Sequence, residues 1–188
     1  MKLQYLKKIG TWRDVADEAR TTIGMKEGKA DVMPSTSWKY KILMAEHSPI
    51  RLLHYHWKWI DIPYCYSVHF ARHKVGIEHW VKTSRSDRTG IDRATLSQEH
   101  PVNHSCEANA QAIINISRKR LCRQASPTTQ EAWQLVVNEL KIVEPCLADI
   151  CVPSCVAKGF CPEFKSCGYI NSEAGKEARQ AYKALIDH

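Results

Sequence analysis

The sequence contains no run of eighteen consecutive apolar residues, which excludes a transmembrane helix of ordinary length. Segment 1–8 has no apolar signal core and no small-residue cleavage site, and this predicts a cytoplasmic protein. The chain also lacks a glycine-rich phosphate loop, a His-Glu-x-x-His zinc motif and a Gly-x-Ser-x-Gly nucleophile turn. The most familiar signatures of nucleotide hydrolases, metalloproteases and esterases are therefore missing, as are internal repeats and low-complexity tracts.

The length of 188 residues fits a single domain spanning 1–188, and a hydrophobic fraction of 44% is ordinary for a folded chain. The formal net charge of +7 is spread along the sequence and suits a phosphorylated small molecule, a nucleic acid or an anionic membrane surface. Aromatic residues do not interleave with a basic strand as they do in nucleic-acid-binding platforms. A small anionic substrate is therefore favoured over nucleic acid.

The clearest strand is predicted at 53–62, where apolar and polar residues alternate strictly. Tyr55, Trp57 and Trp59 face one way, and this face is expected to be buried. His54 and His56 lie on the other face, where hydrogen bonding within the sheet is favoured over a shared metal ion.

Other elements follow from apolar spacing and from capping residues. Further strands are predicted at 2–9 and 77–83, and helices at 11–21, 37–46, 63–74, 105–123, 128–143 and from 172 to the end. The predicted N-caps are Thr11, Ser37, Thr128 and Ser172. The connecting segments are polar stretches at 24–34 and 84–104 and a Cys/Pro/Gly-rich loop at 146–170.

The predicted helix 105–123 has an apolar stripe edged by three polar side chains, Asn109, Asn115 and Arg120. Carboxamides and a guanidinium beside an apolar surface are costly unless their donors are satisfied. A planar ligand rich in carbonyl and ring-nitrogen acceptors would satisfy them. The alternative is a solvated helix face with a basic end.

Arg72, His73 and Lys74 place three donors in succession at the end of the predicted helix 63–74. Such a group could hold a phosphate or a cofactor through charge-assisted hydrogen bonds. Alternatively, the cations simply stabilise the C-terminal end of the helix. Arg85 and Arg93 flank a polar loop further along and are weaker indications of the same chemistry.

Four cysteines lie close together in the loop 146–170, namely Cys151, Cys155, Cys161 and Cys167. Thiolates at short spacing on a turn-rich loop suit a tetrahedral structural zinc ion, with Cys122 as an alternative fourth ligand. The other interpretation is a set of reduced cysteines that pack the loop.

Taken in order, several segments between about residues 38 and 168 resemble the flavin-dependent thymidylate synthase family. They are Ser48-Pro49, like part of its His-x-Ser-Pro-Phe-Glu-His turn; Arg72-His73-Lys74, like its Arg-His-Arg signature; Arg93-Ala94-Thr95-Leu96, like its Ala-Arg-x-x-Leu-Pro segment; Asn109-Ala110-Gln111 with Asn115 and Arg120, like its Asn-Ala-Arg, Asn and Leu-Arg positions; and Cys155-Val156 with Gly159 to Glu163 and Cys167-Gly168, like the tail of some members.

The resemblance implies an α+β fold in which a mixed or antiparallel sheet packs with long helices, and a homotetramer with sites shared between chains. It also implies methylation of dUMP to dTMP with methylene-tetrahydrofolate, FAD and NADPH. Arg120 would stabilise the uracil ring as its N3 loses a proton, which is catalysis by electrostatics. The remaining implied site residues are His69, Arg72, Arg85 and Arg93 for the nucleotide, and Ser48, His73, Lys74, Asn109 and Asn115 for the flavin.

The sequence departs from the family's pattern mainly at flavin positions. Ala45-Glu46 stand where the family has Gly-His, and Gln111 replaces an arginine. Ile77, His79 and Trp80 occupy the places of a serine and an Asn-Glu pair. An alternative is therefore a divergent enzyme that binds a pyrimidine deoxynucleotide but transfers one carbon differently, for example as hydroxymethyl, or without bound FAD. A third alternative is a non-enzymatic, zinc-stapled basic module that binds nucleic acid.

Overall fold

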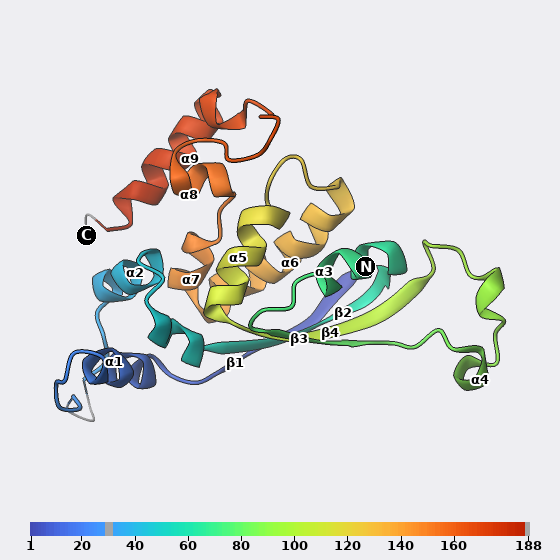
Figure 1. The fold of residues 1–188 in the computed structure, drawn as a ribbon, viewed down its shortest axis with the longest axis horizontal. Coiled ribbons are helices and arrows are strands. Elements are labelled where there is room, and N and C mark those ends of the chain that lie inside the picture. The colour runs from blue at the N-terminus through green and yellow to red at the C-terminus, as the bar shows by residue number, and fades with distance from the viewer. Residues whose placement is uncertain (29–31, 187–188) are drawn as a thin grey trace.

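The computed structural model describes residues 1–28 and 32–186, and its centre is a four-stranded antiparallel sheet (Figure 1). Its strand order is β1 (Lys2–Ile9), β2 (His54–Pro63), β4 (Pro101–Asn109) and β3 (Ile77–Val81). Helices lie against one face of this sheet (Figure 1). The predicted α+β class with an antiparallel sheet is confirmed.

The covered face of the sheet is lined by the aromatic residues of β2. Tyr55, Trp57 and Trp59 are fully buried, as their alternation predicts. On the opposite face, the His54 Nδ1 atom lies 3.2 Å from a carboxylate oxygen of Glu107 on β4. The His56 ring hydrogen-bonds separately within the sheet, so the two histidines do not converge on one point.

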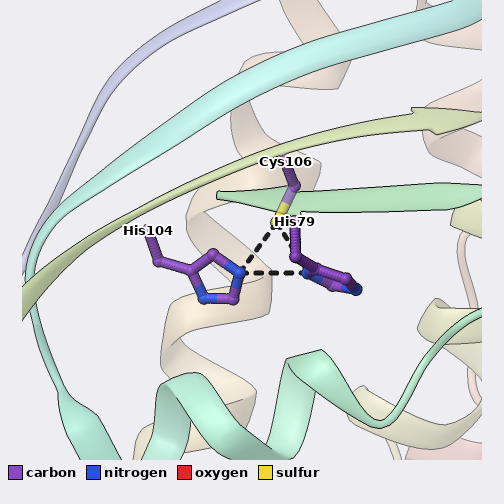
Figure 2. A group of neighbouring side chains, drawn as sticks. All are labelled: His79, His104 and Cys106. Carbon is purple, nitrogen blue, oxygen red and sulfur yellow. Dashed lines mark hydrogen bonds between the residues drawn. The ribbon is translucent and has the colours of Figure 1, made fainter. Parts of the chain in front are cut away.

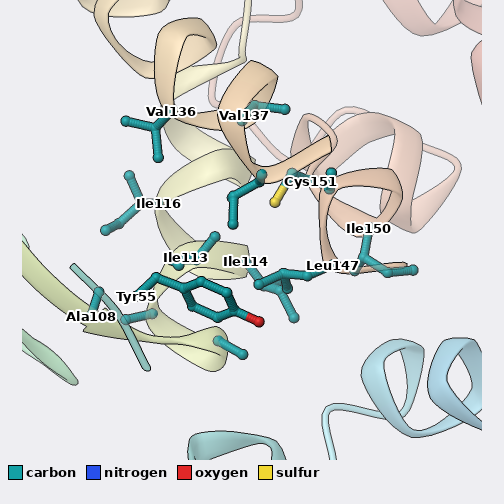
Figure 3. Packing of buried hydrophobic residues seen from close by; sticks show 14 of the residues in the cluster. Tyr55, Ala108, Ile113, Ile114, Ile116, Val136, Val137, Leu147, Ile150 and Cys151 are labelled. Atoms are coloured by element: carbon teal, nitrogen blue, oxygen red, sulfur yellow. The ribbon is translucent and has the colours of Figure 1, made fainter. Parts of the chain in front are cut away.

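Three helices close the core over the aromatic face: α5 (Ala110–Arg120), α6 (Pro127–Val143) and α7 (Pro145–Ile150). Ile113, Ile114 and Trp133 are fully buried where these helices meet the sheet (Figure 3 shows the isoleucines). Burying a side chain of this size stabilises the fold by roughly 1.5–3 kcal/mol. Helices α8 (Ser154–Lys158) and α9 (Glu173–Ala184) lie beyond this layer (Figure 1).

Strand β4 was not predicted from the sequence. Segment 84–104 was expected to be a connection and 105–123 a helix, whereas the strand runs from Pro101 to Asn109 and α5 begins at Ala110. The buried face of β4 includes His104 and Cys106, which do not stand out as an apolar strand face. Within 84–104 the structure also has a short helix α4 (Ser86–Thr89) and a 3-10 turn η2 (Arg93–Thr95).

Several predicted boundaries are also wrong by a few residues. The N-caps of α2 (Thr36–Met44) and α6 are Ser35 and Ser126, not Ser37 and Thr128. Ser126 precedes Pro127, and proline suits the first helical position because its missing N–H is not needed there. Helix α3 (Tyr64–Ala71) ends earlier than predicted, and strand β3 (Ile77–Val81) is shorter than predicted. The predicted loop 146–170 contains helical turns, which belong to α7, α8 and η3 (Tyr169–Asn171).

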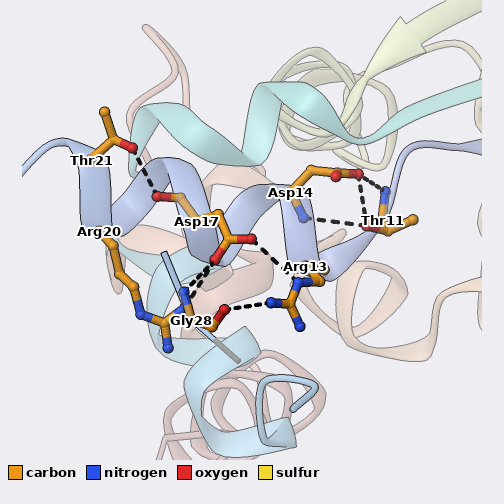
Figure 4. Close-up of polar contacts among 7 residues, drawn as sticks. All are labelled: Thr11, Arg13, Asp14, Asp17, Arg20, Thr21 and Gly28. Carbon is orange, nitrogen blue, oxygen red and sulfur yellow. Dashed lines mark hydrogen bonds and ion pairs between the residues drawn. The ribbon is translucent and has the colours of Figure 1, made fainter. Parts of the chain in front are cut away.

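Helix α1 (Trp12–Thr21) begins as predicted, at a capping box formed by Thr11 and Asp14 (Figure 4). The Asp14 carboxylate accepts hydrogen bonds from the backbone N–H and hydroxyl of Thr11. Ser172 caps α9, also as predicted. Residues 29–31 of the predicted connection and 187–188 of the terminal helix lie outside the described residues. None of the described helices has the length and apolar character needed to cross a membrane.

Candidate functional site

Arg120, the last residue of α5, reaches the segment that follows α3. Its Nε–H donates to Nε2 of His73 at 2.9 Å, and its Nη2 donates to the carbonyl oxygen of His69 at 2.7 Å. These bonds use two of the five N–H groups of a guanidinium. No described carboxylate forms an ion pair with Arg120, which is half-buried. Donors therefore remain for a ligand.

The surroundings of Arg120 are electropositive. Burial lowers its pKa first, and the nearby Arg72 guanidinium lowers it further. Burial, followed by Arg120 and His79, lowers the pKa of His73 to about 4, so this ring is neutral at pH 7 and can accept the Arg120 bond. The pKa of His69 is lowered by burial and then by Arg120 and Arg72. Neutral rings beside two guanidiniums leave the positive charge available to an anion.

Four predicted site residues are thus brought together: His69, Arg72, His73 and Arg120. His69 is further held by α6, because its Nδ1 atom lies 2.9 Å from the Thr129 hydroxyl oxygen. The end of α5, the end of α3 and the start of α6 meet here. The local fold therefore fixes the guanidinium through two acceptors on the segment 69–73, which α6 in turn holds at His69.

Arg85 and Arg93 lie elsewhere, on the connection between β3 and β4 that projects from the end of the sheet (Figure 1). They line a cavity of about 490 Å³ together with Lys82, Ser84 and seven other polar or apolar residues, none of which belongs to the Arg120 cluster. The Arg85 guanidinium is held by both carboxylate oxygens of Asp87, at 2.8 and 3.0 Å. Within one chain, the predicted nucleotide residues therefore form two separate groups.

The positions predicted to contact flavin differ in exposure and in their hydrogen bonds. Ser48, Lys74 and Asn115 are exposed. The Asn109 side chain caps α5 by accepting a hydrogen bond from the Ala112 N–H at 2.9 Å. Among the described residues, no hydrogen bond joins any two of the five predicted flavin residues.

Two of the departures from the family's pattern contact each other. The Gln111 amide donates to the Glu46 carboxylate at 2.5 Å, and Glu46 also forms an ion pair with Arg118. The resemblance expects a histidine in place of Glu46 and an arginine in place of Gln111. Both of these expected side chains would suit the anionic diphosphate of FAD. Here the charges of Glu46 and Arg118 compensate each other, so the group has no unpaired cation to offer. This side of the site does not fit FAD.

The predicted zinc ligands do not meet at one point. Cys151 and Cys155 are buried, Cys161 is half-buried and Cys167 is exposed. Burial, followed by the neighbouring Cys122 and Cys161 thiols, raises the pKa of Cys155. Among the described residues, these cysteines do not form a group of three with ligand atoms within 4.8 Å of one another. A zinc ion on this loop stays a prediction.

A different group of metal-ligating side chains does converge, and the sequence did not predict it. The ligand atoms of His79 on β3 and of His104 and Cys106 on β4 all lie within 4.8 Å of one another (Figure 2). The spacing of His104 and Cys106, two residues apart, would have indicated a shared strand face. That signal was missed because β4 itself was not predicted.

Comparison with known proteins bears on the fold. No protein-family model matches the chain, and no curated protein matches its sequence. The structure is similar to the UMP/dUMP methylase PolB from Streptomyces cacaoi bound with 5-Br dUMP, with a TM-score of 0.65, 10% identity, and coverage of 79% of this chain and 93% of that chain. It is also similar to the flavin-dependent thymidylate synthase ThyX from Helicobacter pylori complexed with FAD and dUMP, with a TM-score of 0.62, 13% identity, and coverage of 81% and 100%.

The chain has the ThyX fold. A second Helicobacter pylori ThyX structure with FAD and dUMP matches with a TM-score of 0.60 at 13% identity, covering 78% of this chain and 99% of that one. The likeness at such low identity concerns the fold, and it supports the architecture that the sequence motifs imply.

Proposed function

We propose that this protein is a divergent member of the flavin-dependent thymidylate synthase family that transfers one carbon to a pyrimidine deoxynucleotide, with dUMP as the substrate. The observation that carries the proposal is Arg120: it is half-buried, fixed by two hydrogen bonds to the His69–His73 segment, and free of a carboxylate partner among the described residues. Arg72 lies beside it and adds positive charge. The ThyX fold supports the same conclusion.

The chemistry follows from a fixed cation beside a planar base. A uracil ring that loses its N3 proton carries negative charge on O2, N3 and O4, and a guanidinium positioned there stabilises that charge. The deprotonated ring is more electron-rich at C5, the carbon that accepts the new group. Because His69 and His73 hold the guanidinium in place, little reorganisation is needed when the charge develops.

We further propose that the active site is shared between chains of a homotetramer. Arg85 and Arg93 lie in a group separate from Arg120 within one chain, yet the resemblance assigns all three to one nucleotide. A neighbouring chain could supply the second group, with the projecting β3–β4 connection reaching across. Arg85 would then exchange Asp87 for a phosphate.

Two forms of the reaction remain, and they differ in their electron balance. Methylation of dUMP to dTMP from methylene-tetrahydrofolate needs a hydride, which FAD and NADPH supply in the form that the resemblance implies. Hydroxymethylation needs no hydride, because water adds to the transferred methylene group and supplies the hydroxyl. The bonding of Glu46 to Gln111 and Arg118, which leaves the flavin side without a free cation, favours the second form.

The proposal is tested by calorimetric titration of the protein with dUMP. Arg120→Ala should weaken dUMP binding on the order of tenfold or more, because a charge-assisted hydrogen bond contributes about 1.5–3 kcal/mol. Lys119→Ala is the matched control: Lys119 is the neighbouring residue on α5, pairs with Glu163 at the surface, and should leave binding unchanged. Equal binding by the two variants would contradict the proposal.

Absorbance spectra with and without added FAD separate the two forms of the reaction. Flavin bands that survive gel filtration support the methylating form, whereas a colourless protein that binds dUMP supports the flavin-free form. The nucleic-acid alternative makes its own prediction: DNA binding with a steep salt dependence and no affinity for dUMP.

A further inference from the structure

Three ligand atoms on the covered face of the sheet point at one another, well outside the predicted cysteine-rich loop. The Nδ1 atom of His79 lies 3.0 Å from Nε2 of His104, and the Cys106 Sγ atom lies 3.3 and 3.2 Å from these two nitrogens. Adjacent strands supply them, since His79 pairs directly with Cys106 in the β3–β4 register. The group, called the His79–His104–Cys106 cluster below, is shown in Figure 2.

The size of this triangle fits a small divalent cation. Around a tetrahedral zinc ion with bonds of about 2.0 Å to nitrogen and about 2.3 Å to sulfur, ligand atoms are separated by about 3.3 Å (N–N) and about 3.5 Å (N–S). Each edge of the cluster is shorter by roughly 0.2–0.3 Å, a difference that small side-chain rotations can absorb. Two imidazoles and a thiolate also suit zinc by ligand type.

The outer hydrogen bonds of both imidazoles fit metal ligation. The Nε2–H of His79 donates to the backbone carbonyl of His73 at 2.8 Å, so in the neutral ring the Nδ1 lone pair points into the cluster. On the other side, Nδ1 of His104 lies 3.1 Å from the Ser67 hydroxyl oxygen, which can accept its N–H. Metal-bound histidines commonly donate their second N–H to such oxygens.

Burial makes the cluster a defined site. His104 and Cys106 are fully buried, and His79 is half-buried on the edge strand. The Trp59 ring closes one side, with its centroid 5.4 Å from that of His104. Most polar groups in such surroundings need a partner. With both ring protons on the outward nitrogens, only the Cys106 S–H can donate within the cluster, and it reaches one nitrogen at a time. A cation would satisfy both nitrogen lone pairs and the sulfur together.

We propose that His79, His104 and Cys106 bind a divalent cation of the zinc class, with three protein ligands and one position left for a water molecule. Binding displaces the Cys106 thiol proton to solvent and leaves both histidines neutral, each with its remaining proton on the outward nitrogen. The ion would tie edge strand β3 to β4, and through the His73 carbonyl it would brace the segment that holds Arg120. The inference does not depend on nucleotide binding.

Cobalt(II) is the probe, because its thiolate complexes absorb in the near ultraviolet and its tetrahedral complexes absorb in the visible. The reduced, chelator-treated full chain is titrated with Co²⁺. We expect saturation of a thiolate-to-cobalt band at one equivalent and loss of the band when Zn²⁺ is added. Cys106→Ser should abolish that band. Absence of any saturable thiolate band in the unmodified protein would overturn the proposal.

Matched variants separate this site from the cysteine-rich loop. Cys161→Ser alters a predicted ligand of that loop and should leave the cobalt band unchanged. If Cys161→Ser removes the band and Cys106→Ser keeps it, the ion belongs to the loop and the proposal is wrong. Ser67→Ala keeps all three ligands and removes only the outer contact to His104, so cobalt affinity should fall by about 10–100-fold.

Substitution of a buried residue can prevent folding, so His79→Gln on the edge strand provides a second ligand variant. Far-ultraviolet circular dichroism establishes that each variant is folded. A folded His79→Gln should bind cobalt at least about tenfold more weakly than the unmodified chain, because it loses one of three ligands. Unchanged affinity in this variant contradicts the proposal even if Cys106→Ser does not fold.

Discussion

At the residue scale, one serine supports the core beneath the candidate site. The Ser117 hydroxyl on α5 accepts the indole N–H of Trp133 at 2.9 Å and donates to the Ile113 carbonyl at 2.8 Å. Ser117 and Trp133 are fully buried. The Ser117 oxygen thus satisfies the only polar group of this buried indole.

Ser117→Ala should therefore lower the free energy of unfolding by about 1–3 kcal/mol, the cost of leaving a buried donor without a partner. Urea denaturation followed by tryptophan fluorescence measures the change. Asn115→Ala, an exposed substitution on the same helix, should not lower stability. If both variants are as stable as the unmodified chain, the Trp133 indole has another acceptor.

At the element scale, periodicity predicted the aromatic strand β2 and the apolar faces of α5 and α6, because large apolar side chains recur there at the spacing of the element. It failed at β4, because the buried side chains of this strand include His104 and Cys106. These two side chains contact each other and do not give the strand a purely apolar face. The candidate site was predicted in the same uneven way. Residues near Arg120 were found through motif order, whereas the His79–His104–Cys106 cluster depends on strand pairing that no local pattern reveals.

The N-terminus of α1 provides a pH test at this scale. Hydrogen bonds from Thr11 are the main cause of the lowered pKa of Asp14. A carboxyl group with a lowered folded-state pKa stabilises the fold above its unfolded pKa, near 3.8, and that stability is lost as pH falls through the folded value. The stability difference between the unmodified chain and Asp14→Asn should thus be present at pH 7 and shrink below about pH 4.

The control for the cap is Glu18→Gln on the same helix, whose side chain has no hydrogen bond within the described part of the chain. Thr11→Ala should cost about 0.5–2 kcal/mol, as removal of an N-cap side chain does. Thermal denaturation at several pH values measures both effects. A stability difference for Asp14→Asn that is the same at pH 7 and pH 3 would refute the role of the carboxylate.

At the scale of the whole molecule, the two groups of arginines predict complementation between subunits. Arg120→Ala and Arg93→Ala each damage a different half of the proposed shared site. Tetramers assembled from an equal mixture of the two variants should regain about one quarter of the dUMP sites, because random pairing reunites an intact Arg120 with an intact Arg93 at that frequency. Each variant alone should bind dUMP weakly.

Calorimetric stoichiometry on the co-expressed, gel-filtered mixture measures the recovery, and light scattering gives the number of chains per particle. The control mixes Arg120→Ala with Lys119→Ala chains, which should restore about half of the sites, because only the first variant damages Arg120. If the mixture of Arg120→Ala and Arg93→Ala recovers nothing, each chain holds its nucleotide alone.

The projecting connection between β3 and β4 has a thermodynamic consequence for the proposed shared site. A nucleotide held by arginines from two chains acts as a bridge, so ligand and subunit affinities are reciprocally linked. Dilution would weaken dUMP affinity, and bound dUMP would stabilise the assembly against dissociation by the same free energy. Cellular nucleotide level would then govern how much of this protein is assembled, without any separate regulatory site.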